Sequence, residues 1–520
     1  MMSAGSQPPI ERHQQGSTPT IAVEPGSERR LVRIAIWGTF DLANFGDLLF
    51  PRIFVHEMTR RLPRADVRVF SPLGYEHPVP LDGGFVAEPL GEWSRERVGE
   101  LAEELDLIAI GGGEIIHTGD ELYARYYDIA PEDARRLAPS AFFLDGLGPD
   151  AERRCPVAWH AVGVPFDIVG EDAARIRTAL ASRAYVSVRD ELSRQRLVRA
   201  GVEREIAVVP DSGFLAERVL PRPLLEKRLR YLRAIGSYPV SEPPVVVQGS
   251  VLLVERAEEI GSALRAALEE RPAPVVLLET GPCHGDGEFA DALARHLTGP
   301  VFRMHGGVGL EDIASAIVHA RAFVGISMHA AVIAFAYGVP AATLNLVGFS
   351  KLDSLSQLLE SERTLVRRGE DLPRAIKRVL DGERPGANLR SLVPRIDAHF
   401  DRLAELAERA AAARRGGDWW QQNAAALAEA DARYERLRRA YEARGQRRVL
   451  ERLRFAELLE RVETGTSRRE TEARLLAHMD ELGRLRRELE ARTRPRGLKK
   501  LLRRITPLRR LHASLRRSRP

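Results

Sequence analysis

The chain has 520 residues, which is more than one ordinary hydrophobic core accommodates, so two or three domains are expected. Hydrophobic residues make up 44% and charged residues 29%, and no run of about 18 apolar residues occurs, which argues against a disordered chain and against a membrane-spanning helix. The net charge of +5 is uneven: residues 491–520 hold twelve Lys and Arg and no Asp or Glu, so subtracting these twelve leaves about −7 for the rest.

Residues 1–30 lack an apolar core, so a disordered N-terminal segment is expected rather than a signal peptide. The chain then alternates apolar runs, typical of strands, with helical patterns at 171–182 and 191–201. The strand candidates are LVRIAIWG at 31–38, DVRVF at 66–70, LDLIAIGGG at 105–113, VAWHAVGV at 157–164, YVSV at 185–188 and EIAVVPD at 205–211. This alternation predicts a parallel sheet covered by helices, so we assign residues 31–215 to an N-terminal Rossmann-like domain.

A second alternating series begins near Pro243, after a plausible connector at 216–242. Its expected strands are 243–250, 274–280 and 322–327, and its expected helices are 254–271, 288–297 and 311–321. We therefore assign residues 216–390 to a C-terminal Rossmann-like domain, which makes the predicted fold class α/β with two such domains in series.

Residues 391–495 are rich in Ala, Glu, Arg and Leu, which predicts a helical and partly coiled-coil region. This region could form either a helical hairpin or a short coil through which the protein forms homo-oligomers. A coiled-coil-like spacing is held by Leu475, Leu482, Leu485 and Leu489. Residues 496–520 form a basic amphipathic tail, either a solvated end with a few packed leucines or a contact with an anionic membrane surface. Nucleic acid is not expected as a partner, because the tail has no aromatic residues for stacking on bases.

Several loops follow candidate strands at the edge where open α/β sheets bind ligands. Asn44, Gly46 and Asp47 follow the first strand, where they either make the turn and cap a helix or contact a sugar or a transferring proton. Gly111, Gly112 and Gly113 follow the apolar strand, where they either bring the backbone close to a phosphate or sugar, with Glu114 opening a helix, or form a tight turn packed on the neighbouring domain. Their spacing does not match a dinucleotide-binding motif.

Three further strand ends carry charged or titratable residues. Arg189 is expected either to bind a phosphate or carboxylate or to form a plain salt bridge, and Asp190 to cap the following helix. Asp211 follows Pro210 as a turn or site residue. His329 falls in the first turn of a helix starting near Ser327, where free N–H groups favour an anion, although such a histidine can also be purely structural.

Taken together, these stretches resemble the polysaccharide pyruvyl transferase family over about residues 33–360. The motifs that carry the likeness are N-x-G-D from Asn44, the three glycines, S-V-R-D-x-x-S from Ser187, Pro210-Asp211, and His329-Ala330 followed by Gly338-Val339-Pro340, with Lys351 as the family's late lysine. The resemblance implies a glycosyltransferase-B-like pair of domains with the active site in the cleft. It also implies transfer of a pyruvyl group from phosphoenolpyruvate to a sugar of a cell-surface polysaccharide or its precursor, forming a ketal.

The resemblance suggests that His329 binds an anion or acts as an acid, and that Arg189 binds an anion. It also suggests that Asp47 activates a hydroxyl group or contacts the sugar. These three are the candidate catalytic residues. The candidate substrate-binding residues are Asn44, Gly46, Gly111, Gly112, Gly113, Glu114, Asp190, Asp211, Ser327 and Lys351. No metal or cofactor is expected, and phosphoenolpyruvate is the expected donor substrate.

The chain departs from the family at one position, because Ser327-Met328-His329 stands where Arg-Leu-His is usual. That arginine is expected to bind the donor anion. Either the donor differs, or another cation such as Arg303 or His305 replaces the arginine, or the activity is lost. The alternatives to pyruvyl transfer are a nucleotide-sugar glycosyltransferase of similar fold and a non-catalytic glycan-binding scaffold.

The expected location is cytoplasmic, because the only cysteines, Cys155 and Cys283, cannot form a disulfide framework and match no metal spacing. The basic tail suggests a peripheral position at the inner face of the membrane. Such a position would suit a saccharide acceptor that is linked to a lipid.

Overall fold

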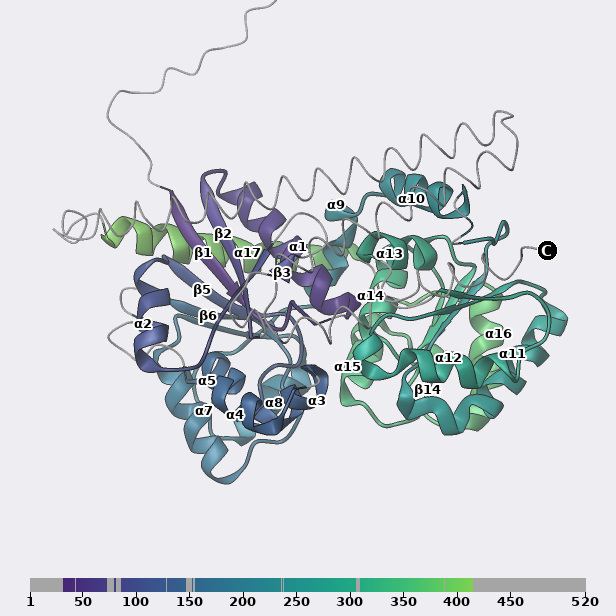
Figure 1. Ribbon diagram of the computed structural model, residues 1–520, viewed down its shortest axis with the longest axis horizontal. Helices are drawn as coiled ribbons and strands as arrows, with labels where there is room; N and C mark the ends of the chain where they lie inside the picture. The colour runs from purple at the N-terminus through teal and green to yellow at the C-terminus, as the bar shows by residue number, and fades with distance from the viewer. Residues whose placement is uncertain are drawn as a thin grey trace, which may run out of the picture.

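The computed structural model describes residues 31–414, apart from residues 43, 73–78, 81–85, 128, 146–151, 153–154, 235, 237, 305–308 and 388. Within that range two α/β domains lie side by side, each built on one sheet (Figure 1). The predicted N-terminal segment, the coiled-coil leucines and the basic tail lie outside the described residues.

The first sheet has eight described strands in the order β3-β4-β2-β1-β5-β6-β7-β8, and all its neighbouring pairs are parallel except β3 with β4. The strands are β1 (Val32–Trp37), β2 (Ala65–Ser71), β3 (Val79–Pro80), β4 (Val86–Pro89), β5 (Leu107–Gly111), β6 (Val157–Val162), β7 (Tyr185–Val188) and β8 (Ala207–Val208). The helices of this domain are α1 (Phe45–Arg61), α2 (Arg95–Glu103), α3 (Asp120–Tyr127), α4 (Pro131–Leu137), α5 (Pro139–Leu144), α7 (Gly170–Ser182) and α8 (Glu191–Arg199).

The second sheet has six described strands in the order β11-β10-β9-β12-β13-β14, all parallel. They are β9 (Val245–Gln248), β10 (Val275–Leu278), β11 (Val301–Met304), β12 (Ala322–Gly325), β13 (Ala341–Leu344) and β14 (Leu365–Val366). The chain reaches this sheet through η1 (Ser212–Leu215), α9 (Ala216–Val219) and α10 (Arg222–Ala234). The other helices are η2 (Val251–Arg256), α11 (Ala257–Glu270), η3 (Pro282–His284), α12 (Asp286–Ala294), α13 (Leu310–Val318), α14 (Met328–Ala336), α15 (Ser350–Leu359), η4 (Glu362–Thr364), η5 (Gly369–Asp371) and α16 (Leu372–Leu380).

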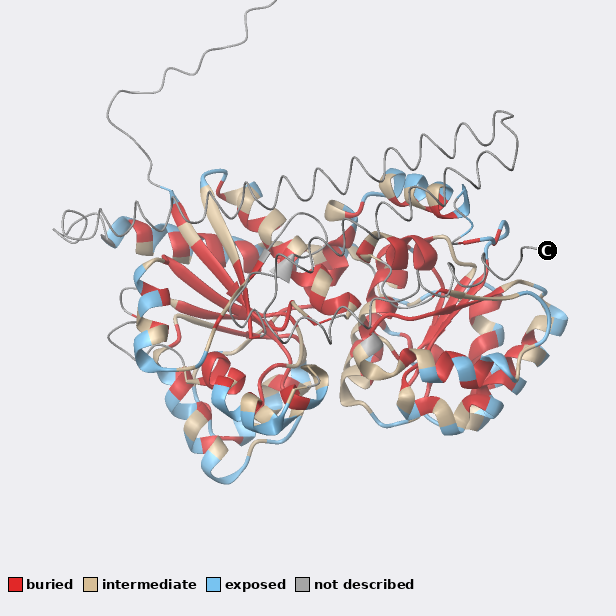
Figure 2. Ribbon diagram, viewed as in Figure 1, coloured by how far each residue is buried: buried red, intermediate tan, exposed pale blue. Residues whose placement is uncertain are grey.

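Both sheets are buried on their two faces, and the exposed residues lie mainly on the outer sides of the helices (Figure 2). Central strands such as β5, β6 and β9 are buried along their whole length, as expected for parallel strands covered by helices. The α/β fold with two parallel sheets that the sequence predicted is therefore confirmed.

The last described helix, α17 (Leu389–Arg414), returns to the first domain after the second domain is complete (Figure 1). It packs against α1, β1 and β5. The buried side chains recur every three or four residues along one face, as an amphipathic helix requires: Leu392, Ile396, Phe400, Leu403, Ala407 and Ala411. On this face His399 Nε2 lies 2.7 Å from Nδ1 of His160, so two buried imidazoles join α17 to β6.

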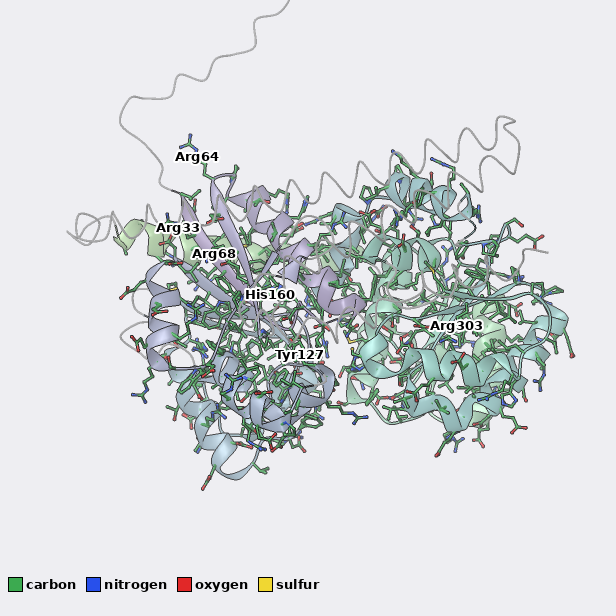
Figure 3. All side chains as sticks on the ribbon, viewed as in Figure 1. Arg33, Arg64, Arg68, Tyr127, His160 and Arg303 are labelled. Carbon is green, nitrogen blue, oxygen red and sulfur yellow. The ribbon has the colours of Figure 1, made fainter. Side chains whose placement is uncertain are left out.

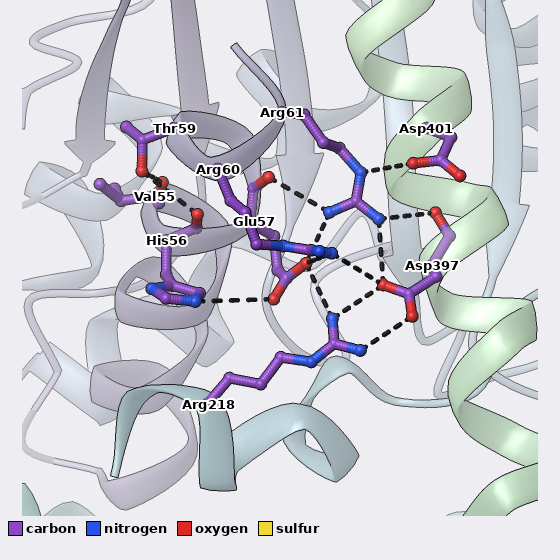
Figure 4. A network of polar contacts seen from close by, with 9 residues as sticks. All are labelled: Val55, His56, Glu57, Thr59, Arg60, Arg61, Arg218, Asp397 and Asp401. Carbon is purple, nitrogen blue, oxygen red and sulfur yellow. Dashed lines mark hydrogen bonds and ion pairs between the residues drawn. The ribbon is translucent and has the colours of Figure 1, made fainter. Parts of the chain in front are cut away.

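A network of ion pairs fixes α17 to the rest of the protein (Figure 4). Glu57 of α1 is 0% exposed, and its Oε2 lies 2.5 Å from Arg61 and 3.0 Å from Arg218. The same two arginines reach Asp397 of α17, at 3.0 Å and 2.7 Å. Because Arg218 belongs to α9, the network ties α17 and α1 to the segment that leads into the second domain.

We expect Glu57→Gln to lower the free energy of unfolding by about 1.5–3 kcal/mol, because Arg61 and Arg218 each lose one of their carboxylate partners and keep Asp397. Urea denaturation followed by circular dichroism measures the change. The matched control is Glu405→Gln, on the exposed side of α17, where the pairs with Arg402 and Arg409 contribute about 0.5 kcal/mol or less. Equal urea midpoints for Glu57→Gln and Glu405→Gln would show that the network does not stabilise the fold.

Candidate active site

The loops at the carboxyl ends of the two sheets meet between the domains, and most of the predicted site residues lie in them. The backbone N–H of Phe45, at the start of α1, donates a hydrogen bond of 2.8 Å to the Thr280 carbonyl after β10. Lys351 Nζ, in the first turn of α15, lies 3.0 Å from Oε2 of Glu114 in the first domain. The edges of the two sheets thus form one site.

His329 lies in the first turn of α14, as predicted, and packs against α1 of the other domain. Its ring meets Phe50 edge-on, with ring centroids 5.0 Å apart. Gly46 provides the space for the ring, since a Cβ at this position would lie 2.1 Å from His329 Nδ1. On the opposite side, His329 Nε2 is 3.6 Å from Oδ2 of Asp211, so the imidazole lies between a helix N-terminus and a buried carboxylate.

Asp47 is buried in the first turn of α1, and Thr39 Oγ donates a hydrogen bond of 2.8 Å to its Oδ1. A Cβ on Gly113 would lie 3.7 Å from the same oxygen, so the glycine loop after β5 adjoins this carboxyl group. Burial raises the pKa of Asp47 to about 6, although the hydrogen bond from Thr39 and the proximity of His329 oppose the rise. Asp47 can therefore bind or release a proton near neutral pH. The cap of α1 is Asn44, whose Oδ1 accepts from the Gly46 N–H at 3.3 Å.

Glu114 joins two cations that come from different domains. Its Oε1 lies 3.1 Å from an Nη of Arg189, which follows β7, and its Oε2 accepts from Lys351. Burial acts to raise the pKa of Glu114, but the charges of Lys351 and Arg189 outweigh burial and hold the pKa near about 2. Glu114 is therefore ionised at neutral pH.

The expectation that Glu114 opens a helix is wrong. Gly112 and Gly113 have φ angles of 93° and 121°, a conformation that suits glycine and carries the chain away from a helical path. A loop follows instead, and α3 begins only at Asp120. The glycines thus place Glu114 at the strand end.

The remaining predicted residues have local structural roles at the same edge. Asp190 caps α8, with Oδ1 accepting from the Ser193 N–H at 2.7 Å. Asp211 Oδ1 accepts from the Gly213 N–H at 2.8 Å, which leaves Oδ2 for His329. Ser327 caps α14 by accepting from the Ala330 N–H at 3.3 Å and contributes no charge.

The structure does not support Arg303 as a replacement for the absent arginine. Arg303 lies on β11, at the edge of the second sheet, and its Nε donates to Glu279 at 2.9 Å. A second bond of 3.0 Å runs to the Gly287 carbonyl, and Asp291 also pairs with the guanidinium. Figure 3 shows Arg303 over the second domain, well away from Tyr127 of the first domain. His305 lies outside the described residues.

Two aromatic residues that the sequence prediction missed meet where the two domains face each other. Tyr126 of α3 meets His284 of η3 edge-on, with ring centroids 5.5 Å apart. His284 Nε2 also lies 3.4 Å from Asn44 Nδ2. Burial, followed by the nearby positive charge of Lys351, lowers the pKa of His284 to about 4, so its imidazole is neutral at pH 7. The signal for His284 was its position just after the predicted strand at 274–280.

In the described part of the chain, no group of three or more His, Cys, Asp or Glu side chains is arranged to hold a metal ion. Over the same residues, no helix combines the length and the apolar composition that crossing a membrane requires. The charged side chains where the described domains meet include the carboxyl groups of Asp47, Glu114 and Asp211 and the cations Arg189 and Lys351.

A two-domain α/β protein that gathers buried acids and cations where its domains meet has the features of an enzyme. The sequence model of the polysaccharide pyruvyl transferase family matches residues 44–346, which is more than half of the chain and includes both domains. The chain belongs to this family, which is a family of transferases. Among curated proteins, none matches the sequence closely enough to count as a relative.

Several solved structures are similar to the chain at low sequence identity. The UDP-GlcNAc 2-epimerase of Methanocaldococcus jannaschii is 14% identical, with 72% of this chain and 99% of that chain covered and a TM-score of 0.48. The enzyme of the same name from Neisseria meningitidis, bound to UDP-GlcNAc, is 11% identical, with 72% and 99% covered and a TM-score of 0.45. Sucrose-phosphate synthase from Thermosynechococcus elongatus is 15% identical, with 79% and 100% covered and a TM-score of 0.41.

We expect Gly46→Ala to lower transferase activity by about 100-fold, because the new Cβ would force the His329 ring to shift by about 1 Å or more. Steady-state rates and thermal unfolding of the purified variant separate this effect from misfolding. The matched control is Gly99→Ala in α2, where a Cβ would meet nothing within 4 Å. Wild-type activity in Gly46→Ala would mean that the position of His329 is unimportant.

Proposed function

We propose that the protein transfers a pyruvyl group from phosphoenolpyruvate to two hydroxyl groups of one sugar, forming a cyclic ketal and releasing phosphate. The main support is the convergence of Arg189, Lys351 and His329, from both domains, beside a buried Asp47 whose pKa is about 6. The reaction needs cationic groups for a donor with two anionic ends and a group that exchanges protons near neutral pH.

The donor binds in this proposal with its carboxylate and phosphate between the two domains. Arg189 supplies a planar guanidinium, and Lys351 supplies a point charge from the opposite side of the cleft. The N-termini of α1 and α14 add backbone N–H groups that favour anions. These groups take the place of the arginine that Ser327 replaces.

Asp47 exchanges the protons of the first step. In its protonated form it delivers a proton to C3 of phosphoenolpyruvate, while a sugar hydroxyl bonds to C2 and gives its own proton to the Asp47 carboxylate. The C2–O bond to phosphate then breaks, and phosphate leaves with the bonding electrons. The second hydroxyl bonds to C2 and its proton leaves with phosphate, so the products are a ketal with one new methyl group and inorganic phosphate.

His329 and Asp211 support this chemistry as a pair. The buried Asp211 carboxylate lies beside Nε2 and orients the ring, whose Nδ1 is at the N-terminus of α1, next to Asp47. Burial acts to raise the pKa of Asp211, but His329 and Arg189 outweigh it and keep the pKa below the ordinary value, so Asp211 is ionised. In this proposal His329 holds the donor anion while Asp47 transfers the proton.

The acceptor in this proposal is a saccharide of a cell-surface polysaccharide or of its lipid-linked precursor. Tyr126 and His284 flank the cleft with an aromatic face and a neutral imidazole, a combination suited to sugar rings and hydroxyl groups. We further propose a cytoplasmic location with membrane-surface contact through the basic tail, and self-association through residues 391–495, which the sequence predicts to be helical.

The donor assignment is tested by incubating the purified protein with phosphoenolpyruvate and a panel of methyl glycosides that offer neighbouring hydroxyl pairs in cis and trans arrangements. We expect phosphate release with at least one glycoside and a loss of about 100-fold or more in His329→Ala. A thermal shift comparison provides the control for the donor. Stabilisation by UDP without stabilisation by phosphoenolpyruvate would contradict the proposal and favour a nucleotide-sugar glycosyltransferase.

The pH dependence tests the role of Asp47. Because protonated Asp47 starts the reaction, kcat/KM is expected to fall about tenfold per pH unit above pH 6. The Thr39 hydroxyl stabilises the ionised carboxylate, so Thr39→Val should raise the pKa of Asp47 and move this decline to higher pH by about one unit. The control is Thr178→Val on α7, outside the site, which should leave the profile in place. An unshifted decline in Thr39→Val would exclude Asp47 as the titrating group.

A further inference from the structure

The position between Arg189 and Lys351 is occupied by a group of the protein itself. One oxygen of Glu114 faces Arg189 at 3.1 Å, and the other oxygen accepts a hydrogen bond of 3.0 Å from Lys351. A donor carboxylate or phosphate would use two oxygens in the same way to reach the same two cations.

Arg189 is only partly satisfied by this arrangement. Its side chain is 6% exposed, yet its Nη2 makes no hydrogen bond in acceptable geometry with any described residue, although Glu114 lies at ion-pair distance. The second nearby carboxylate, Asp190, caps α8 through Oδ1 and places its Oδ2 3.7 Å from Nε of Arg189, beyond hydrogen-bond distance. A buried guanidinium with an unpaired N–H is costly, and an incoming anion that aligns with it would gain a charge-assisted hydrogen bond.

The surroundings of Glu114 are suited to a side chain that changes position. Glu114 follows Gly112 and Gly113, two residues with positive φ, and it precedes a loop rather than a helix. Its side chain packs over Gly163, where a Cβ would lie 2.7 Å from Glu114 Cγ. The backbone around Glu114 is hydrogen-bonded to Gly163, whereas the two carboxylate oxygens contact Arg189 and Lys351.

We propose that the Glu114 carboxylate stands in for the anion of the donor in the free protein and that the donor must displace it to bind. Glu114 is then a specificity-determining residue: it keeps the two cations paired while the cleft is empty, and it weakens the binding of any anion that cannot compete with it. This inference rests on the proposed function only for the identity of the donor. Displacement of Glu114 by an anion is independent of the reaction that follows.

Isothermal titration calorimetry of the full chain with phosphoenolpyruvate, and separately with inorganic phosphate, tests the proposal. In Glu114→Gln the amide no longer competes for the cations, so both ligands should bind about tenfold tighter or more than to the wild type. The ligand-free variant should melt at a lower temperature, because buried Arg189 loses its counter-charge, and phosphate should restore the melting temperature. Glu121→Gln, on the exposed start of α3, is the matched control and should bind both ligands as the wild type does.

Weaker binding of both ligands to Glu114→Gln would overturn the proposal, since it would show that Glu114 orients the cations for the ligand. If Glu114→Gln does not fold, Glu114→Asp replaces it: the shorter side chain keeps its charge but cannot bridge both cations, so binding should again be tighter than in the wild type. Tighter binding in either variant together with no ketal formation by the wild type would sustain this inference and reject the proposed function. No binding of either ligand to any form would reject both.

Discussion

The cleft depends on the pairing of charged groups that are buried where two domains meet. Arg189, Asp47 and Asp211 are 6%, 8% and 2% exposed, and isolated charges are not stable at such burial. All three belong to the first domain, whereas Lys351 and His329, the partners that approach them, belong to the second. Arg189 pairs with Glu114 of its own domain, but the pairs Lys351–Glu114 and His329–Asp211 cross between the domains, so part of the charge of the site is balanced only while the domains are in contact.

The sequence predicted the two-sheet architecture because parallel strands covered on both faces are continuous apolar runs. Most of the strands that were not predicted lack that signature, although β13 was also missed and is buried along its whole length. β3, β4 and β14 are two to four residues long, and β11 at the sheet edge is half-buried and carries a charged Arg303. The composition of residues 391–495 indicated a helical region, but composition does not identify the surface that α17 covers. The return of α17 to the first sheet, fixed by His399 and Asp397, depends on contacts between residues far apart in sequence.

The site was predictable to the extent that it lies at strand ends. Turn and cap residues after apolar runs led to Asp47, Arg189 and His329, and the two-sheet geometry brings their segments together. Local sequence patterns do not predict contacts between domains, and for this reason Tyr126 and His284 were missed. The same limit explains Glu114: the glycines before it were recognised, but their positive φ angles, which prevent a helix, depend on packing.

The path of the chain between the domains has a mechanical consequence. The polypeptide passes from the first domain to the second through η1 and α9, and α17 brings it back to the first domain. Two separate segments of the chain therefore connect the two domains. Two domains that are connected at two points can rotate relative to each other only about the axis that joins these points. Because the Glu57–Arg218–Asp397 network joins both connections to each other, we expect any relative rotation of the two domains to use this pair of connections as its hinge.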